Sequence, residues 1–145
     1  MWQYHNPNPK GKLVGDCTVR AISTATGKGW MDTYLDLCLF GLLNGDMPSS
    51  NAITTVYLKN QGFKRRTIPD SCPDCYCVGD FCKDHPQGTF VIGTGSHLTT
   101  VIDGTLWDSW GSTLVVMLFS VIMGCYIAGL DVGLSWVIDK IMGRG

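Results

Sequence analysis

Residues 97–110, HLTTVIDGTLWDSW, decide the fold class of this chain. The pair Asp103-Gly104 is the strongest short-range signal for a β-hairpin, and it separates two runs rich in β-branched and aromatic residues, 97–102 and 105–110. A similar run, TFVIGT at 89–94, lies just upstream. The sequence therefore predicts an antiparallel sheet of three strands.

Helices are predicted upstream of this sheet. Asp16 is a good N-cap for a helix over 17–26, and Gly27 stops that helix. A second helix fits 30–43, with an apolar stripe at helical spacing formed by Met31, Tyr34, Leu35, Cys38, Leu39 and Leu42. Weaker signals predict helices over 51–61 and 78–85 and a strand over 63–68. Helices followed by an antiparallel sheet make an α+β fold.

Length and charge narrow the function classes. The 145 residues favour one domain, and 11 basic against 12 acidic residues give a net charge of −1. Because no basic patch stands out, we expect no nucleic-acid partner. The first ten residues are polar, without the apolar segment of a signal peptide, and the number of cysteines, seven, is odd. These features favour a cytoplasmic location with reduced thiols, and the sequence leaves the oligomeric state open.

The predicted hairpin brings a histidine and an aspartate together. A two-residue turn pairs Ile102 with Thr105, which puts His97 and Asp108 on one face of the sheet as diagonal neighbours, roughly 7–8 Å apart at the backbone. Asp108 can then orient the imidazole of His97. Asp103 lies about 20 Å from His97 at the usual strand rise, so we exclude it as the partner.

Cys17 is the nucleophile candidate. It falls in the first turn of the predicted helix, where the helix dipole and free backbone N–H groups favour a thiolate. A thiolate, an imidazole base and an orienting carboxylate make a catalytic triad, so we predict Cys17, His97 and Asp108 as catalytic residues. The alternative for Cys17 is a small buried apolar side chain with no chemical role.

Two stretches resemble a known family. GDCTVRAISTATGKGW at 15–30 and HLTTVIDGTLWDSW at 97–110 are similar to segments of papain-like (C39-like) cysteine peptidases found in phages and mobile elements of Gram-positive bacteria. The resemblance covers residues 8–112. It implies a papain-like fold with Cys17 at a helix start, and a hydrolase that attacks an amide or related carbonyl of a peptide or protein substrate.

The resemblance also implies an oxyanion hole completed by a side-chain amide upstream of the cysteine. Family members carry a glutamine six residues before the nucleophile, whereas Gly11 stands there in this chain. Asn8 is the favoured substitute, and Asn6 and Gln3 are alternatives.

A cysteine cluster, CPDCYCVGDFCKDH, has two metal-like spacings. Four of its side chains could close a tetrahedral structural zinc site: Cys72, Cys75, Cys82 and His85. The alternative is a loop and a short helix with Cys82 packed inward. We expect no cofactor other than this zinc.

The composition changes near residue 112, where we predict the end of a domain over 1–112. Residues 114–130 contain no charged side chain, and the family does not continue in this way. This run could be a transmembrane or interfacial helix within a segment over 113–145, or a buried strand pair. Residues 132–142 could then lie at a membrane interface, with Trp136 as an anchor.

Two alternatives to the peptidase remain. One is a non-catalytic binding module on the same fold. The other is a small membrane protein of a phage or mobile element, in which the uncharged segment is the working part.

Overall fold

The computed structural model describes residues 1–69, 75–109, 112–141 and 143; the side chains of 112–117, 135–137, 139 and 141 are excepted. The chain separates into two compact units, residues 1–109 and 110–145, whereas the composition predicts a division at 112. Each unit is described by itself.

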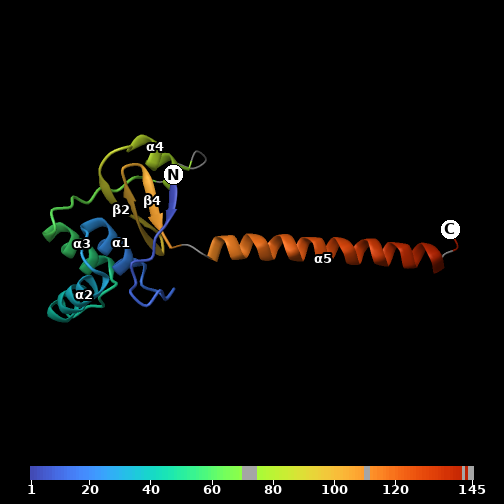
Figure 1. Cartoon of the computed structure of the whole chain (residues 1–145), viewed down its shortest axis with the longest axis horizontal. Helices are drawn as coiled ribbons and strands as arrows, with labels where there is room; N and C mark the ends of the chain where they lie inside the picture. The colour runs from blue at the N-terminus through green and yellow to red at the C-terminus, as the bar shows by residue number, and fades with distance from the viewer. Residues whose placement is uncertain (70–74, 110–111, 142, 144–145) are drawn as a thin grey trace. The chain divides into compact units, whose positions relative to one another are not determined.

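The first unit combines helices with a sheet (Figure 1), so the predicted α+β class is confirmed. Its elements in chain order are β1 (Trp2–Tyr4), α1 (Cys17–Thr26), α2 (Trp30–Asn44), α3 (Asn51–Asn60), α4 (Val78–Asp84), β2 (Thr89–Thr94), β3 (His97–Ile102) and β4 (Thr105–Asp108). The strand predicted over 63–68 is wrong, because these residues form no regular element.

The sheet has the strand order β1-β4-β3-β2. The predicted hairpin register is confirmed, since Ile102 pairs with Thr105 across the β3–β4 turn. Asp103 and Gly104 have φ angles of 49° and 69°, the left-handed conformations that a tight hairpin turn requires. The N-terminal strand β1 adds to the sheet in parallel with β4, which the sequence did not predict.

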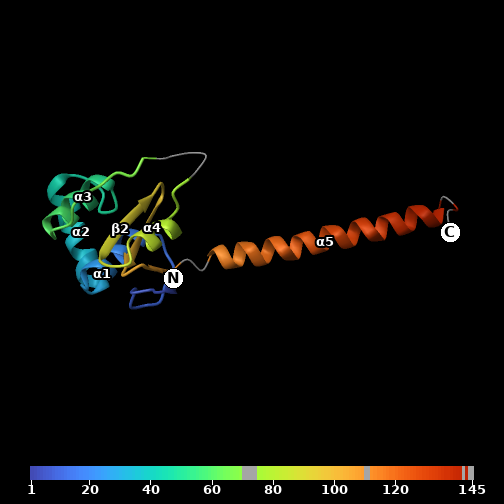
Figure 2. The ribbon, with the colours of Figure 1, turned by 90° about the horizontal axis from the view of Figure 1, so that it is seen from above.

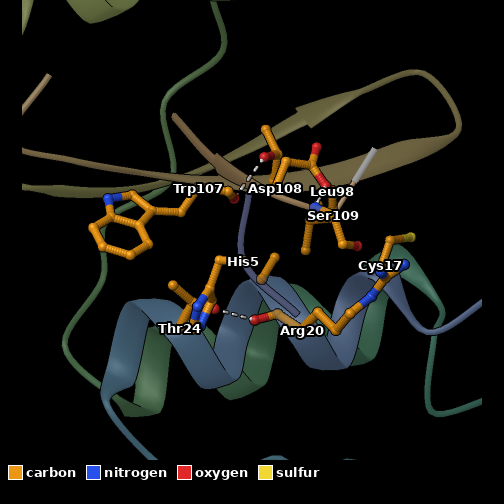
Figure 3. A pocket seen from close by; sticks show the side chains of 10 residues that line it. His5, Cys17, Arg20, Thr24, Leu98, Trp107, Asp108 and Ser109 are labelled. Atoms are coloured by element: carbon orange, nitrogen blue, oxygen red, sulfur yellow. Dashed lines mark hydrogen bonds between the residues drawn. The ribbon is translucent and has the colours of Figure 1, made fainter. Parts of the chain in front are cut away.

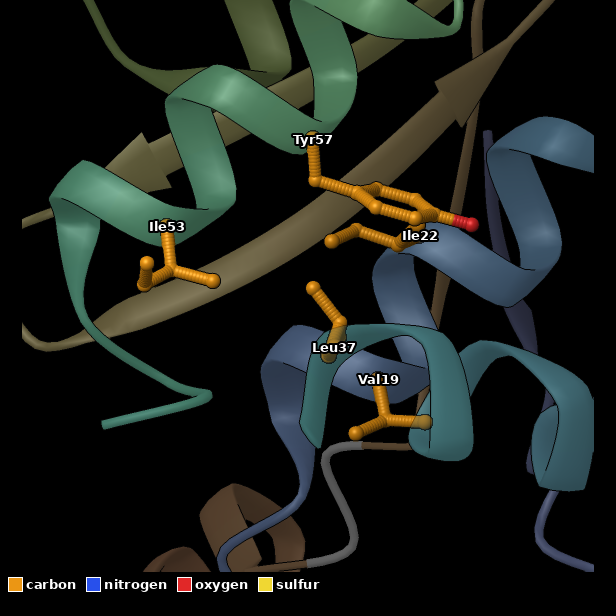
Figure 4. Close-up of a cluster of buried hydrophobic side chains, with 5 residues drawn as sticks. All are labelled: Val19, Ile22, Leu37, Ile53 and Tyr57. Carbon is orange, nitrogen blue, oxygen red and sulfur yellow. The ribbon is translucent and has the colours of Figure 1, made fainter. Parts of the chain in front are cut away.

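The apolar core lies where three helices meet. Figure 4 shows Val19 and Ile22 of α1, Leu37 of α2, and Ile53 and Tyr57 of α3 converging on one another, and all five are buried. A buried hydrogen bond ties α1 to the sheet, because the Thr100 hydroxyl of β3 donates to the Ala21 carbonyl over 2.7 Å. The core therefore fixes α1 against the strands that carry His97 and Asp108.

Helix α2 presents an unexpected face to this core. Its buried residues are Thr33, Leu37 and Gly41, not the apolar stripe that periodicity predicts. A Cβ atom at Gly41 would lie 2.6 Å from the Asp46 carbonyl oxygen. Only glycine allows the residues after the helix to pack this closely, so the side of α2 that carries Gly41 is the buried one. The predicted stripe faces solvent, with exposed fractions between 45% and 78% for Met31, Tyr34, Leu35, Leu39 and Leu42.

The second unit is a single helix, α5 (Ser112–Ile141) of 30 residues, which Figure 2 shows in orange to red. Every described side chain between residues 118 and 134 is exposed. Within the residues that the structure describes, no helix combines the length and apolarity required to cross a membrane.

Candidate functional site

The hairpin brings His97 and Asp108 into contact. His97 begins β3 and Asp108 ends β4, and the Nε2 atom of His97 lies 2.7 Å from Oδ2 of Asp108. Both side chains are mostly buried, with 16% and 12% of their surfaces exposed. The other Asp108 oxygen accepts the Ser109 backbone N–H over 2.7 Å. The carboxylate is therefore fixed, and it holds the imidazole at one ring nitrogen.

Cys17 is the first residue of α1 and is half-buried. Together with Asp108 it lines a cavity of about 10 Å³, large enough for about one water molecule. Figure 3 shows Cys17, Arg20 and Thr24 on the helix, facing the strand that carries Trp107 and Asp108. The structure thus brings Cys17 and the His97–Asp108 pair to one region of the first unit.

Asp16 precedes this helix and is almost fully buried. Its position before the helix predicts an N-cap, but the Asp16 side chain makes no capping hydrogen bond to α1. Its Oδ2 atom accepts the Asn8 amide over 3.1 Å and the Trp30 indole N–H over 2.9 Å. Its Oδ1 atom forms an ion pair with Arg20, at 2.9 Å from Nε. This contact is not a hydrogen bond, because the Nε–H group does not point at the oxygen. Asp16 therefore joins α1, α2 and the N-terminal segment.

Asn8 is part of this buried network. Its Oδ1 atom accepts the Lys10 backbone N–H over 3.0 Å, while its amide nitrogen donates to Asp16. In this structure Asn8 holds Asp16, and its role at an oxyanion hole stays a prediction. No local pattern in the sequence indicates the contributions of Arg20 and Trp30, because both depend on chain segments that meet only in the fold.

A larger hollow lies beside this network. It has a volume of about 380 Å³ and is lined by His5, Pro7, Ser23, Thr24, Gly27, Lys28, Gly29, Trp30, Ile102 and Trp107. The His5 ring meets the Trp107 ring edge to face at 5.4 Å. These lining residues come from the N-terminal segment, the C-terminal part of α1, the start of α2 with the connection between them, and the β3–β4 hairpin, so sequence periodicity could not predict the hollow.

The cysteine cluster is only partly within the described residues, since Cys72 lies outside them. Cys82 is buried, and the His85 ring stacks on Phe81 at 4.0 Å with Nδ1 3.1 Å from the Phe81 carbonyl oxygen. Over the described part of the chain, no group of three or more side chains is arranged to hold a metal ion. The structural zinc site stays a prediction.

Several polar groups in and beside α4 have shifted pKa values, among them Asp80 and Tyr76. The thiol of Cys77, together with Lys83, lowers the pKa of Asp80 to about 2. A hydrogen bond of 2.7 Å to the Asp84 carboxylate raises the pKa of Tyr76 to about 12. Both groups lie at the protein surface, so these are local interactions.

A second polar cluster links the helices. The carboxylate of Asp36 accepts the Lys28 ammonium over 2.6 Å and the Tyr57 hydroxyl over 2.9 Å. Both hydrogen bonds lower the pKa of Asp36, and the bond from Lys28 has the larger effect. The pKa of Tyr57 is raised mainly by burial of its hydroxyl group and, to a smaller extent, by the hydrogen bond to the Asp36 carboxylate.

Comparison with known proteins gives one family. The family described as SecE/Sec61-gamma subunits of protein translocation complex matches residues 108–142, which include nearly all of α5. No curated protein and no solved structure matches the chain.

The match corrects the assignment made from the sequence. The family similar to this chain is a subunit of a translocation complex and not a papain-like cysteine peptidase, so the predicted peptidase family, enzyme class and hydrolase function are wrong. The catalytic roles of Cys17, His97 and Asp108 stay predictions. The similarity to a known family is confined to the C-terminal segment, residues 108–142.

Proposed function

We propose that the chain is a membrane-embedded protein whose helix α5 packs against a membrane-protein partner, as a component of a protein translocation complex. The observation that carries this proposal is the exposure of every described side chain from 118 to 134 on the helix that matches the SecE/Sec61-gamma family. The papain-like topology and the cytoplasmic location stay predictions, and the proposal depends on neither.

Water is a poor environment for α5. Its exposed large apolar side chains include Leu118, Phe119, Val121, Ile122, Met123, Ile127 and Leu130, each at least 41% exposed. Burying one such side chain fully is worth about 1.5–3 kcal/mol. A helix that is apolar on all sides is found in a protein interior or in a membrane. The exposed surface of α5 therefore requires a cover.

The length of the uncharged part suits a bilayer. Residues 112–130 contain no charged side chain, and the first charge of α5 is Asp131. Within the described residues no helix is by itself long and apolar enough to span a bilayer. Counted from the full sequence, however, the 19 uncharged residues extend about 28 Å at the helical rise, close to the thickness of a hydrocarbon core, about 30 Å. This agreement supports the membrane rather than a soluble protein as the main cover.

A line of small residues supports a helical partner. Ser120, Gly124 and Ala128 follow one another at intervals of four along α5. A Cβ atom added at Gly124 would meet nothing within 4 Å, so there is open space at this position of the line. Helices associate in membranes through such small residues, because they allow close backbone approach.

The membrane part of the proposal is tested with a charge in the middle of α5. The full chain should stay in the membrane pellet after an alkaline carbonate wash. Ile122→Arg should move it to the supernatant, because an arginine there costs about 2.5–3.5 kcal/mol, which corresponds to about a hundredfold in partition. Ile138→Arg is the matched control, since Ile138 is similarly exposed, at 49% against 55%, but lies beyond the uncharged part. Equal extraction of the two variants would contradict the proposal.

The partner part has a separate test. A photo-crosslinking amino acid at Val121, which is 65% exposed and lies one turn before Gly124 on the same side of the helix, should form an adduct with a protein that mass spectrometry identifies as a translocation subunit. Gly124→Ile should reduce this adduct without releasing the chain from the membrane, because it blocks the close approach. Met123→Ile, on the neighbouring face of the helix, should leave the adduct unchanged. Adducts with lipid alone would refute a protein partner.

A further inference from the structure

We propose that two copies of this chain associate through α2, which packs antiparallel against α2 of the second copy. The proposal concerns the first unit and is independent of α5. The surface is the apolar stripe that faces solvent, which consists of Met31, Tyr34, Leu35, Cys38, Leu39 and Leu42 and is here called the α2 stripe.

The α2 stripe is complementary to itself. In an antiparallel pair with the two-fold axis between residues 36 and 37, each stripe residue lies opposite another stripe residue of the second copy. Met31 meets Leu42, Tyr34 meets Leu39, and Leu35 meets Cys38. A two-fold interface requires the same patch on both subunits, and this helix satisfies that condition with all six positions.

The exposed area is sufficient for a dimer. The five large residues of the stripe have exposed fractions of 61%, 45%, 62%, 53% and 78% in chain order. With about 200 Å² for a fully exposed large apolar side chain, they present roughly 600 Å² on each copy. A pair would bury roughly 1,200 Å² in total, which is the lower end of specific, stable interfaces.

The charges of α2 favour a second copy over a lipid surface. The helix contains Asp32 and Asp36 but neither lysine nor arginine. Helices that bind membrane surfaces carry basic residues beside their apolar face, so this composition is unfavourable for lipid. Both aspartates lie about 90° or more around the helix from the centre of the stripe, so they flank the contact without entering it. Asp36 is also neutralised by Lys28.

The test uses the full chain in mild detergent micelles at tens of micromolar, because even standard interfaces of about 1,600 Å² can have affinities no tighter than micromolar. A short bismaleimide should join Cys38 to Cys38 of the second copy, since packed helices lie 8–10 Å apart. Tryptic peptides identify this adduct and separate it from any association through α5. Leu39→Glu should reduce its yield at least tenfold. Leu13→Glu is the matched control, because Leu13 is exposed to a similar degree, at 58% against 53%, and lies outside α2.

Leu42→Glu provides a second variant and should act as Leu39→Glu does, because residue 42 lies opposite Met31 in the pair. Unchanged thermal unfolding of both variants establishes that they fold. No Cys38 adduct in the parent chain would overturn the proposal, whether lipid or another protein then covers the stripe. Equal adduct yields for Leu39→Glu and Leu13→Glu would overturn it as well.

Discussion

Substitution of Gly104 by alanine tests the hairpin that positions His97 and Asp108. Gly104 has a φ angle of 69°, a conformation that costs an L-residue roughly 1–2 kcal/mol. The space around it is also occupied. A Cβ atom there would lie 2.9 Å from the Cys82 carbonyl oxygen and 3.2 Å from Pro86 Cα, and both are backbone atoms that cannot rotate away.

The matched control is Gly95→Ala, at the turn between β2 and β3. Gly95 has a φ angle of 52°, but a Cβ atom added there would meet nothing within 4 Å. It therefore incurs only the conformational cost of roughly 1–2 kcal/mol. Gly104→Ala adds an overpacking cost of about 1–3 kcal/mol. We expect Gly104→Ala to lower the free energy of unfolding by about 1–3 kcal/mol more than Gly95→Ala does.

The measurement is urea unfolding of the full chain in mild detergent, followed by tryptophan fluorescence, since Trp2, Trp30 and Trp107 all lie in the first unit. The difference between the variants should appear as a lower urea midpoint with an unchanged slope. If both variants lost the same stability, the close packing of the hairpin turn on the segment around Pro86 would be refuted.

Two hydroxyl groups and one core side chain give further predictions. Tyr57→Phe should cost about 1 kcal/mol at neutral pH, since it removes a hydrogen bond to a half-exposed carboxylate. Because the native pKa of Asp36 is lowered from 3.8, this contribution is present above that pH and disappears as pH falls through the native pKa, which acid unfolding curves of both forms would show. Tyr76 should titrate near pH 12 in ultraviolet absorbance, and Asp84→Asn should return its pKa toward 10. Leu37→Ala should lower the free energy of unfolding by about 2–5 kcal/mol in thermal melts, because Leu37 is only 1% exposed.

The parts of the fold that could be predicted depend on neighbouring residues. The Asp103-Gly104 turn sets the register of β3 and β4, and the register in turn places His97 beside Asp108. Strand β1 could not be predicted, because three residues carry little periodicity and their partners lie about a hundred residues away. The Asp16 side chain likewise has partners that are distant in the sequence. A cap was expected from its position in the sequence, but Asn8 and Trp30 approach it only in the folded chain.

Helix α2 shows what periodicity establishes and what it leaves open. The spacing of Met31, Leu35 and Leu42 correctly indicates that these residues share one face of a helix. It does not indicate which surface covers that face. The core instead receives Leu37, on the side of the helix that also carries Thr33 and Gly41, and the missing side chain at Gly41 allows the residues after the helix to approach closely. The same limit applies to α5, where the uncharged run predicts that the helix is buried but does not indicate whether lipid or protein surrounds it. In both helices apolar side chains remain exposed within the single chain, so the surfaces that bury them lie outside this chain. For α2 we propose a second copy, and for α5 a membrane and a protein partner.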